Sequence, residues 1–360
     1  MESTHLHQPN VAASHPADAG LRALLRTPGS IYSIPLPSAA PRPGEMSQPL
    51  AKSTTLSLSF TPRSAPRAVG SVLAAALDSR WQLYRGQLRR SQEKFSEEAV
   101  HELRVATRRL LAQLTLLSCA APSASLEKAR RLLKRRLAAL GDLRDTQVQR
   151  LFTEQKVASF PELVLLRGWL LRRERRLAKS ARRKVSQFKT RKLERWVAGM
   201  IGDLNANAGR SRAQTQLASA VLRAAAQAFA EAAERRQAID LADMRTIHQT
   251  RVAFKRFRYI LESLSPDLTG LSRRQLRALA YYQRKMGIIQ DLEVLQACVA
   301  RYTRQDRKRE VLLKRFVGHL RQRRARALRS FLKSADRIFD FWPPATVAAR
   351  GIAFPARNAA

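Results

Sequence analysis

Apolar residues recur at spacings of three and four positions from about Gly70 onward, and no run alternates apolar with polar residues as a strand would. Leu, Ala, Arg and Glu dominate this region, which favours helices. The pattern is interrupted at a few Pro-, Gly- or Asn-containing points, namely Ala121–Ser123, Phe160–Pro161, Gly202–Gly209, Ser265–Pro266 and Trp342–Pro344. The sequence therefore predicts an all-α protein.

Outside this region the composition changes. Residues 1–68 are rich in Pro, Ser, Ala and Thr and show little helical periodicity, so we expect a disordered leader. Residues 69–342 form the predicted helical domain, and residues 343–360 are a short tail.

Two segments 147 positions apart share one pattern. Residues 100–110 read VHELRVATRRL and residues 247–257 read IHQTRVAFKRF, with the common frame His-x-x-Arg-Val-Ala-x-(Arg/Lys)-Arg. A Gly-x-x-x-Asp element follows each segment, at Gly141–Asp145 and at Gly287–Asp291. Matches at nearly the same offset, 147 positions for the segments and 146 for the Gly-x-x-x-Asp elements, indicate a duplicated unit.

The duplication divides the domain into one repeat at about 69–205 and a second at about 212–342. The breaks divide each repeat into about four helices. Two tandem four-helix bundles would satisfy this pattern.

The shared segment separates into two helical faces. At 100° per residue, an apolar packing stripe falls on one side and consists of Leu103, Ala106, Leu110, Leu114 and Leu117. A basic stripe lies on the other side, with His101, Arg104 and Arg108 in the first repeat and His248, Arg251 and Lys255 in the second. Arg109 and Arg256 flank it.

Cations stacked at intervals of about one helical turn repel each other. We therefore expect an anion from outside the helix to compensate the charge of the basic stripes. The whole chain has the same imbalance, with 67 Lys and Arg against 28 Asp and Glu and a formal net charge of +39. Such an excess attracts polyanions, and a chain of phosphates would supply the missing charge. The alternative is an ordinary solvated face. This alternative is weaker because the stripe occurs in both repeats, whereas Gly141, Asp145, Gly287 and Asp291 fit structural roles better.

Other features narrow the function class. Two cysteines, Cys119 and Cys298, make no disulfide framework, and we recognise neither a signal peptide nor a membrane span, so we expect a cytoplasmic protein. We find no P-loop, no His-Glu-x-x-His motif and no acidic pair beside the His stripe. We therefore expect no enzyme, no cofactor and no metal site.

The repeated segments, with the Gly-x-x-x-Asp elements and the run Lys255–Glu262, resemble the CHAD domain (conserved histidine α-helical domain) over about residues 70–340. The resemblance implies two four-helix bundles related by a pseudo-two-fold, with a basic cleft between them. It also implies binding of inorganic polyphosphate and association with polyphosphate granules in the bacterial cytoplasm. The acidic triphosphate-handling domain that precedes CHAD in many relatives has no counterpart here.

The resemblance also suggests site residues. Those implied for polyphosphate binding are His101, Arg104, Arg108, Arg109, His248, Arg251, Lys255, Arg256 and Arg258. Weaker candidates on other helices are Arg135, Arg136, Arg172, Arg176, Arg284, Lys285, Arg323 and Arg324. The first repeat has Leu111 where the second has Arg258, so the half-sites are expected to be unequal. The competing interpretation is a nucleic-acid-binding helical protein, although only 6% of residues are aromatic and could stack on bases.

Overall fold

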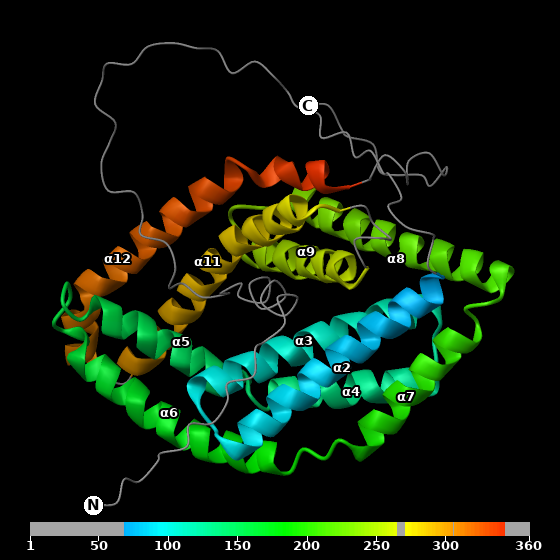
Figure 1. The fold of residues 1–360 in the computed structure, drawn as a ribbon. Coiled ribbons are helices and arrows are strands. Elements are labelled where there is room, and N and C mark those ends of the chain that lie inside the picture. Colours follow the sequence, from blue (N-terminus) through cyan, green and yellow to red (C-terminus); the bar gives the residue numbers. More distant parts are fainter. Residues whose placement is uncertain (1–67, 265–270, 305, 343–360) are drawn as a thin grey trace, which may run out of the picture. The chain divides into compact units, whose positions relative to one another are not determined.

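The computed structural model describes residues 68–264, 271–304 and 306–342 (Figure 1). Every regular element in these ranges is a helix, which confirms the all-α prediction. In chain order they are α2 (Val69–Glu93), α3 (Glu97–Ala120), α4 (Ala124–Ala138), α5 (Gly141–Lys156), α6 (Leu163–Ser186), α7 (Arg191–Ala206), α8 (Ser211–Gln237), α9 (Arg245–Ser263), α11 (Arg273–Thr303), α12 (Arg307–Leu332) and the 3-10 helix η1 (Ala335–Phe341). The predicted leader, apart from Ala68, and the predicted tail lie outside the described residues.

Side-chain caps explain where several helices begin. Ser96 and Ser123 accept hydrogen bonds from backbone N–H groups in the first turns of α3 and α4. Ser272 forms a capping box at the start of α11, and Asp306 caps α12. Each cap satisfies backbone donors that have no partner within the helix, so these four residues fix the start of their helices.

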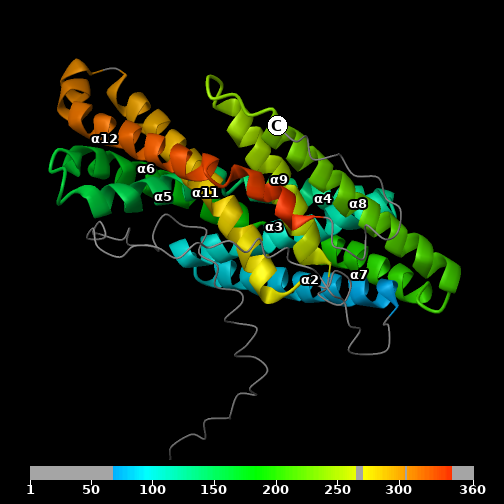
Figure 2. The same cartoon turned by 90° about the horizontal axis from the view of Figure 1, so that it is seen from above.

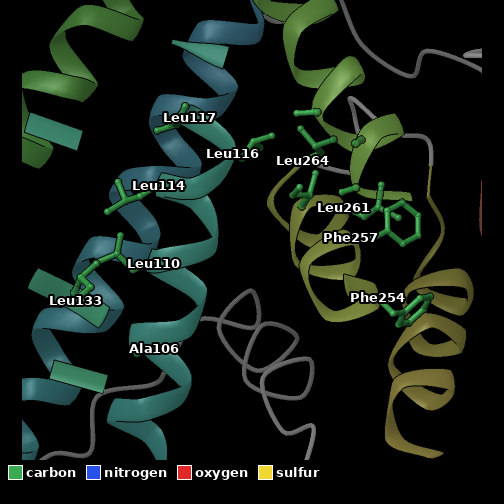
Figure 3. Close-up of a cluster of buried hydrophobic side chains, with 14 of the residues drawn as sticks. Ala106, Leu110, Leu114, Leu116, Leu117, Leu133, Phe254, Phe257, Leu261 and Leu264 are labelled. Atoms are coloured by element: carbon green, nitrogen blue, oxygen red, sulfur yellow. The ribbon is translucent and has the colours of Figure 1, made fainter. Parts of the chain in front are cut away.

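The main hydrophobic core surrounds α3. Its predicted apolar stripe is buried, from Leu103 at 1% exposure to Leu117 at 2%. Figure 3 shows Leu110 and Leu114 on the side of α3 that faces Leu133, whereas Leu116 points toward the region of Leu264 near the end of α9. Leu116 is also fully buried, so α3 is covered on more than one side. Helices of both repeats cover it, because α2, α4, α8 and α9 all pack against α3.

A second group of buried apolar residues lies outside this cluster, on α5, α6, α11 and α12, which gather at one end of the described helices in both views (Figures 1 and 2). The rings of Phe160 and Phe316 lie 5.4 Å apart, and those of Trp169 and Tyr302 lie 5.5 Å apart. These contacts join the first repeat to the second within one core. The finer prediction of two tandem bundles about a pseudo-two-fold is not confirmed by this packing and stays a prediction.

The repeats also differ in their helices. The first contains six, from α2 to α7, where the sequence predicted about four. One cause is an interruption between α4 and α5, where the Ala139 N–H turns back to the carbonyls of Arg135 and Leu137. The matching part of the second repeat, α11, runs unbroken through Gly287 and Asp291. Because of this interruption, the carbonyl of Leu137 at the end of α4 can accept a hydrogen bond from Arg104.

Among the helices that the structure describes, none has the length and apolar character needed to cross a membrane.

Candidate polyanion-binding site

The basic stripes of the two repeats meet because α3 packs directly against α9. Helices α5 and α11 carry the Gly-x-x-x-Asp elements and pack against each other, and α5 also packs against α3 and α11 against α9. Their charged side chains lie close enough to shift one another's pKa values. We call this set the central cluster: Arg104 and Arg108 of α3, Arg144 and Asp145 of α5, Arg251, Lys255 and Arg258 of α9, and Asp291 of α11.

Three cations of the central cluster form no hydrogen bond or ion pair with an anion among the described residues, although the charges of Asp145 and Asp291 act on the arginines among them from farther away. Within the described ranges, Arg108 and Arg251 form neither a hydrogen bond nor an ion pair, and Lys255 contacts only the ring of Tyr259, 5.8 Å from its centroid. The Nε atom of Arg251 is buried without an acceptor. A buried donor without an acceptor costs free energy, and the Nε atom of Arg251 is one of several such donors in the described residues.

Arg104 and Arg251 occupy equivalent sequence positions but have different surroundings. The Nη1 atom of Arg104 donates to the Leu137 carbonyl at 2.9 Å, at the end of α4. The last carbonyls of a helix lack partners within it, and the interruption after α4 therefore provides an acceptor for Arg104. Since α11 is continuous at the matching point, its carbonyls bond within the helix. Arg251 consequently has no such acceptor, which makes it the less constrained of the two.

Burial and mutual repulsion shift the protonation of the cluster. Burial, reinforced by Arg108, Arg251, Arg258 and Arg104, lowers the pKa of Lys255 to about 7. Burial raises the pKa of Asp291 to about 6, although Arg251 opposes this shift. The low-dielectric surroundings thus disfavour every charged form, cationic or anionic.

The two histidines lie in unlike environments. Burial, followed by Arg144 and Arg108, lowers the pKa of His101 to about 4, so this ring is neutral at neutral pH. His248 is exposed and forms a hydrogen bond through Nδ1 to Gln290, which occupies the place of Arg144 in the second Gly-x-x-x-Asp element. The two histidines therefore differ in their contacts, and the inequality predicted from Leu111 and Arg258 stays a prediction.

Two arginines near the stripes were not singled out from the sequence. Arg144 pairs with Glu97 at 3.2 Å and shifts the pKa values of His101 and Asp145. Its position directly before Asp145, inside the repeated Gly-x-x-x-Asp element, was the feature of the sequence that could have identified it. Arg80 of α2 is largely covered and donates to the Glu262 carbonyl at 2.6 Å. The sequence around Arg80 offers no comparable signal, because only the packing of α2 near α9 brings it there.

Of the remaining sequence-predicted residues, Arg258 belongs to the central cluster, and Arg256 and Arg109 lie beside it. Arg256 points to α8, where it pairs with Glu231 at 2.9 Å. Arg258 pairs with Glu262 at 3.4 Å and covers the Tyr259 ring. Arg109 lies near Arg80, whose pKa it helps to lower.

The weaker candidates are dispersed over four helices. Arg324 pairs with Glu293 at 3.4 Å, Arg323 covers the Phe152 ring, and Lys285 donates to Ser334 at 2.7 Å. Arg284 is half-buried on α11. Arg135, Arg172 and Arg176 are exposed, on α4 and α6. None of these residues is among the groups that shift the pKa values of the central cluster.

Arg136 is buried within the first repeat. It donates to the Tyr84 hydroxyl and to the Lys189 carbonyl, each at 2.5 Å, and covers the Phe188 ring. These contacts join α4 to α2 and to the segment before α7. The guanidinium of Arg136 is therefore occupied by contacts within the protein.

We therefore expect Arg136→Met to lower the free energy of unfolding by about 2 kcal/mol, because charge-assisted hydrogen bonds are lost and Tyr84 is left without its partner. Polyanion affinity of the folded variant should stay within about twofold of wild type. Urea unfolding and a binding titration measure the two quantities. A large loss of affinity without loss of stability would instead place Arg136 in the site.

Within the described residues, no group of three or more His, Cys, Asp or Glu side chains is placed to hold a metal ion.

Fold and site together define an all-α protein in which basic side chains from two sequence repeats converge. The chain belongs to the CHAD domain family, whose model matches residues 72–300. It is similar to the crystal structure of the CHAD domain from the plant Ricinus communis, with 19% identity, a TM-score of 0.55, and coverage of 84% of this chain and 98% of that one. It is also similar to PptA from Streptomyces chartreusis, with 16% identity, a TM-score of 0.51, and coverage of 74% and 99%. At these identities the two structures support the fold alone. No curated protein matches the chain.

Proposed function

We propose that the protein binds inorganic polyphosphate at the central cluster and catalyses no reaction on it. The observation that carries the proposal is the convergence of Arg108, Arg251 and Lys255, which come from both repeats and form no ion pair or side-chain hydrogen bond in the described structure. Membership of the CHAD family supports it. Arg provides paired donors to phosphate oxygens and Lys a compact charge, so these side chains suit a phosphate chain.

The proposed binding is multivalent. A polyphosphate chain carries a negative charge on each phosphate and can contact cations of both repeats at once, releasing their counterions. Affinity should rise with chain length and fall with salt concentration. Association with polyphosphate granules would follow, because a granule presents many such chains.

The groups in the cluster favour holding an anion over reacting with it. Burial raises the pKa values of the two carboxylates, Asp145 and Asp291, and the neighbouring arginines oppose this shift only in part. His101 is close to Arg104 and Arg108, and its low pKa leaves little protonated imidazole to act as a general acid near neutral pH. Binding without turnover is therefore the simplest use of this site.

A basic face on α6 favours nucleic acid as a second candidate ligand. Several of its side chains are exposed and have no partner within the described structure: Arg172, Arg175, Arg176, Lys179, Arg182 and Arg183. Such a face binds phosphates without reading sequence. Base stacking requires exposed rings, however, and the large exposed apolar side chains of the described part include one aromatic, Tyr281.

Competition between ligands tests the proposal. In about 150 mM salt, we expect unlabelled long-chain polyphosphate to displace a labelled polyphosphate probe at concentrations, counted per phosphate, at least tenfold lower than single- or double-stranded nucleic acid requires. The reason is that a flexible, base-free chain can follow converging cations more closely than a duplex. Equal displacement by all three ligands would favour the nucleic-acid alternative.

A further inference from the structure

A lysine, Lys255, stands in the second repeat where the first repeat has an arginine, Arg108. The two lie at the meeting of α9 and α3, close enough for their charges to interact. An arginine stays protonated at any physiological pH, whereas a lysine that is partly buried among other cations can release its proton. The central cluster therefore contains one side chain, Lys255, whose positive charge depends on pH and on its surroundings.

Neighbouring arginines repel the charged form of Lys255, and no ion pair among the described residues offsets this repulsion. Arg251 and Arg258 face it from α9, and Arg104 and Arg108 face it from α3. Tyr259 contributes a ring face 5.8 Å away. No carboxylate pairs with its ammonium group in the described structure.

The groups that the structure describes on the other neighbouring helices form no ion pair with Lys255. Asp145 and Arg144 of α5 and Asp291 of α11 interact with the arginines of the cluster, and the strongest influences on Lys255 besides burial are arginines. Helix α8 packs on α9 through another face, where Glu231 pairs with Arg256. An anion from outside the chain is thus the group that can stabilise a charged Lys255.

We propose that Lys255 couples polyanion binding to proton uptake, so that the site takes one proton from solvent onto the Lys255 amine as a phosphate chain enters. The inference rests on the proposed function, because it assigns a regulation to the same site. The nitrogen lone pair accepts the proton, and the resulting ammonium group is paired with phosphate oxygens. Acidification favours binding and alkalinity favours release.

The direction of the effect follows from the two states. In the free protein the pKa of Lys255 is lowered to about 7, and a bound polyanion raises it again. Well below pH 7 the amine is protonated in both states, so this group contributes its charge to binding but no longer makes the affinity vary with pH. Above pH 7 binding requires protonation, and affinity should fall about tenfold between pH 7 and pH 8.5.

The test compares the full-length wild type with Lys255→Arg, which copies the residue of the first repeat. Long-chain polyphosphate is the probe, because its internal phosphates keep their charge across this range and its ends contribute little. We expect the affinity of wild type to fall about tenfold from pH 7 to pH 8.5, and that of Lys255→Arg to change less than about twofold. Groups that titrate equally in both proteins cancel in this comparison.

Calorimetry gives a second readout. At pH 8, the binding enthalpy of wild type should vary with the ionisation enthalpy of the buffer, in proportion to about one proton taken up, and that of Lys255→Arg should not. Lys255→Met, which cannot be charged, should bind more weakly than wild type at pH 6 and show the same flat profile above pH 7.

The outcomes separate the two proposals. Binding of polyphosphate by wild type with a flat pH profile and no buffer dependence overturns the role of Lys255 and leaves the proposed function standing. A pH dependence that persists unchanged in Lys255→Arg also overturns it. Absence of binding at pH 6 in the competition and titration assays overturns both.

Discussion

Replacing Arg108 and Arg251 together by alanine is expected to weaken polyphosphate binding by at least about a hundredfold in 150 mM salt. In the proposed site each arginine would contribute charge-assisted hydrogen bonds to phosphate, each worth about 1.5–3 kcal/mol. Neither forms a side-chain hydrogen bond or an ion pair in the described structure, so the substitution breaks no such contact. Because the side chains come from different repeats, the loss would show that both halves hold one ligand.

The salt dependence of the same titration provides an independent check. Removing two phosphate contacts should reduce the slope of log affinity against log salt by about 1.4, using the value for flexible single strands. The melting temperature should not fall, because like charges are removed from a crowded region.

Arg182→Ala with Arg223→Ala is the matched control. These residues lie on α6 and α8, are exposed, and have no partner within the described ranges. The control variant removes the same net charge as the test variant, but from two residues that lie outside the central cluster. Equal losses in the two double variants would show that total charge, and not the central cluster, determines binding.

The second large effect is on stability. Arg150 of α5 has a side chain only 13% exposed, and it binds three carboxylates: Glu174 at 2.6 Å, Glu154 at 2.6 Å and Glu97 at 2.8 Å. These belong to α6, α5 and α3. We expect Arg150→Met to lower the free energy of unfolding by about 3 kcal/mol, because it leaves the carboxylates close together without their shared cation.

Urea unfolding of wild type, Arg150→Met, Glu174→Gln and the double variant measures this effect. Glu174→Gln in the Met background should recover part of the loss, since it removes one uncompensated charge. A loss below about 1 kcal/mol in Arg150→Met would mean that solvent screens the network as it does at an exposed surface.

The helical class and the packing face of α3 could be predicted because both depend on local spacing. Leu103 to Leu117 repeat with the helical period, and the same period aligns the cations on the opposite side. The resemblance of the two His-Arg segments likewise predicted which side chains are equivalent. Arg108 and Lys255 accordingly interact across the repeats.

The side-chain environments that could not be predicted depend on contacts between residues far apart in the sequence. Arg256 has the same local context as Arg109, yet it pairs with Glu231 because α8 lies beside it. Arg136 is one of many basic residues on α4, and its burial depends on Tyr84, 52 positions away. Arg104 is held by the carbonyl at the end of α4, and no periodicity indicates that α4 ends there while α11 continues.

The shared core at the end of the molecule constrains how the protein can be made. Ser159 and Arg315, which bond across that core, are 156 residues apart, so the ribosome completes the α5–α6 hairpin long before its partner α12 exists. At about 5–20 residues per second, the apolar faces of this hairpin wait on the order of ten seconds for Phe316 and its neighbours. During that interval a nascent chain exposes Phe160 and Leu166 to solvent, and it is then most dependent on chaperones and most prone to aggregate.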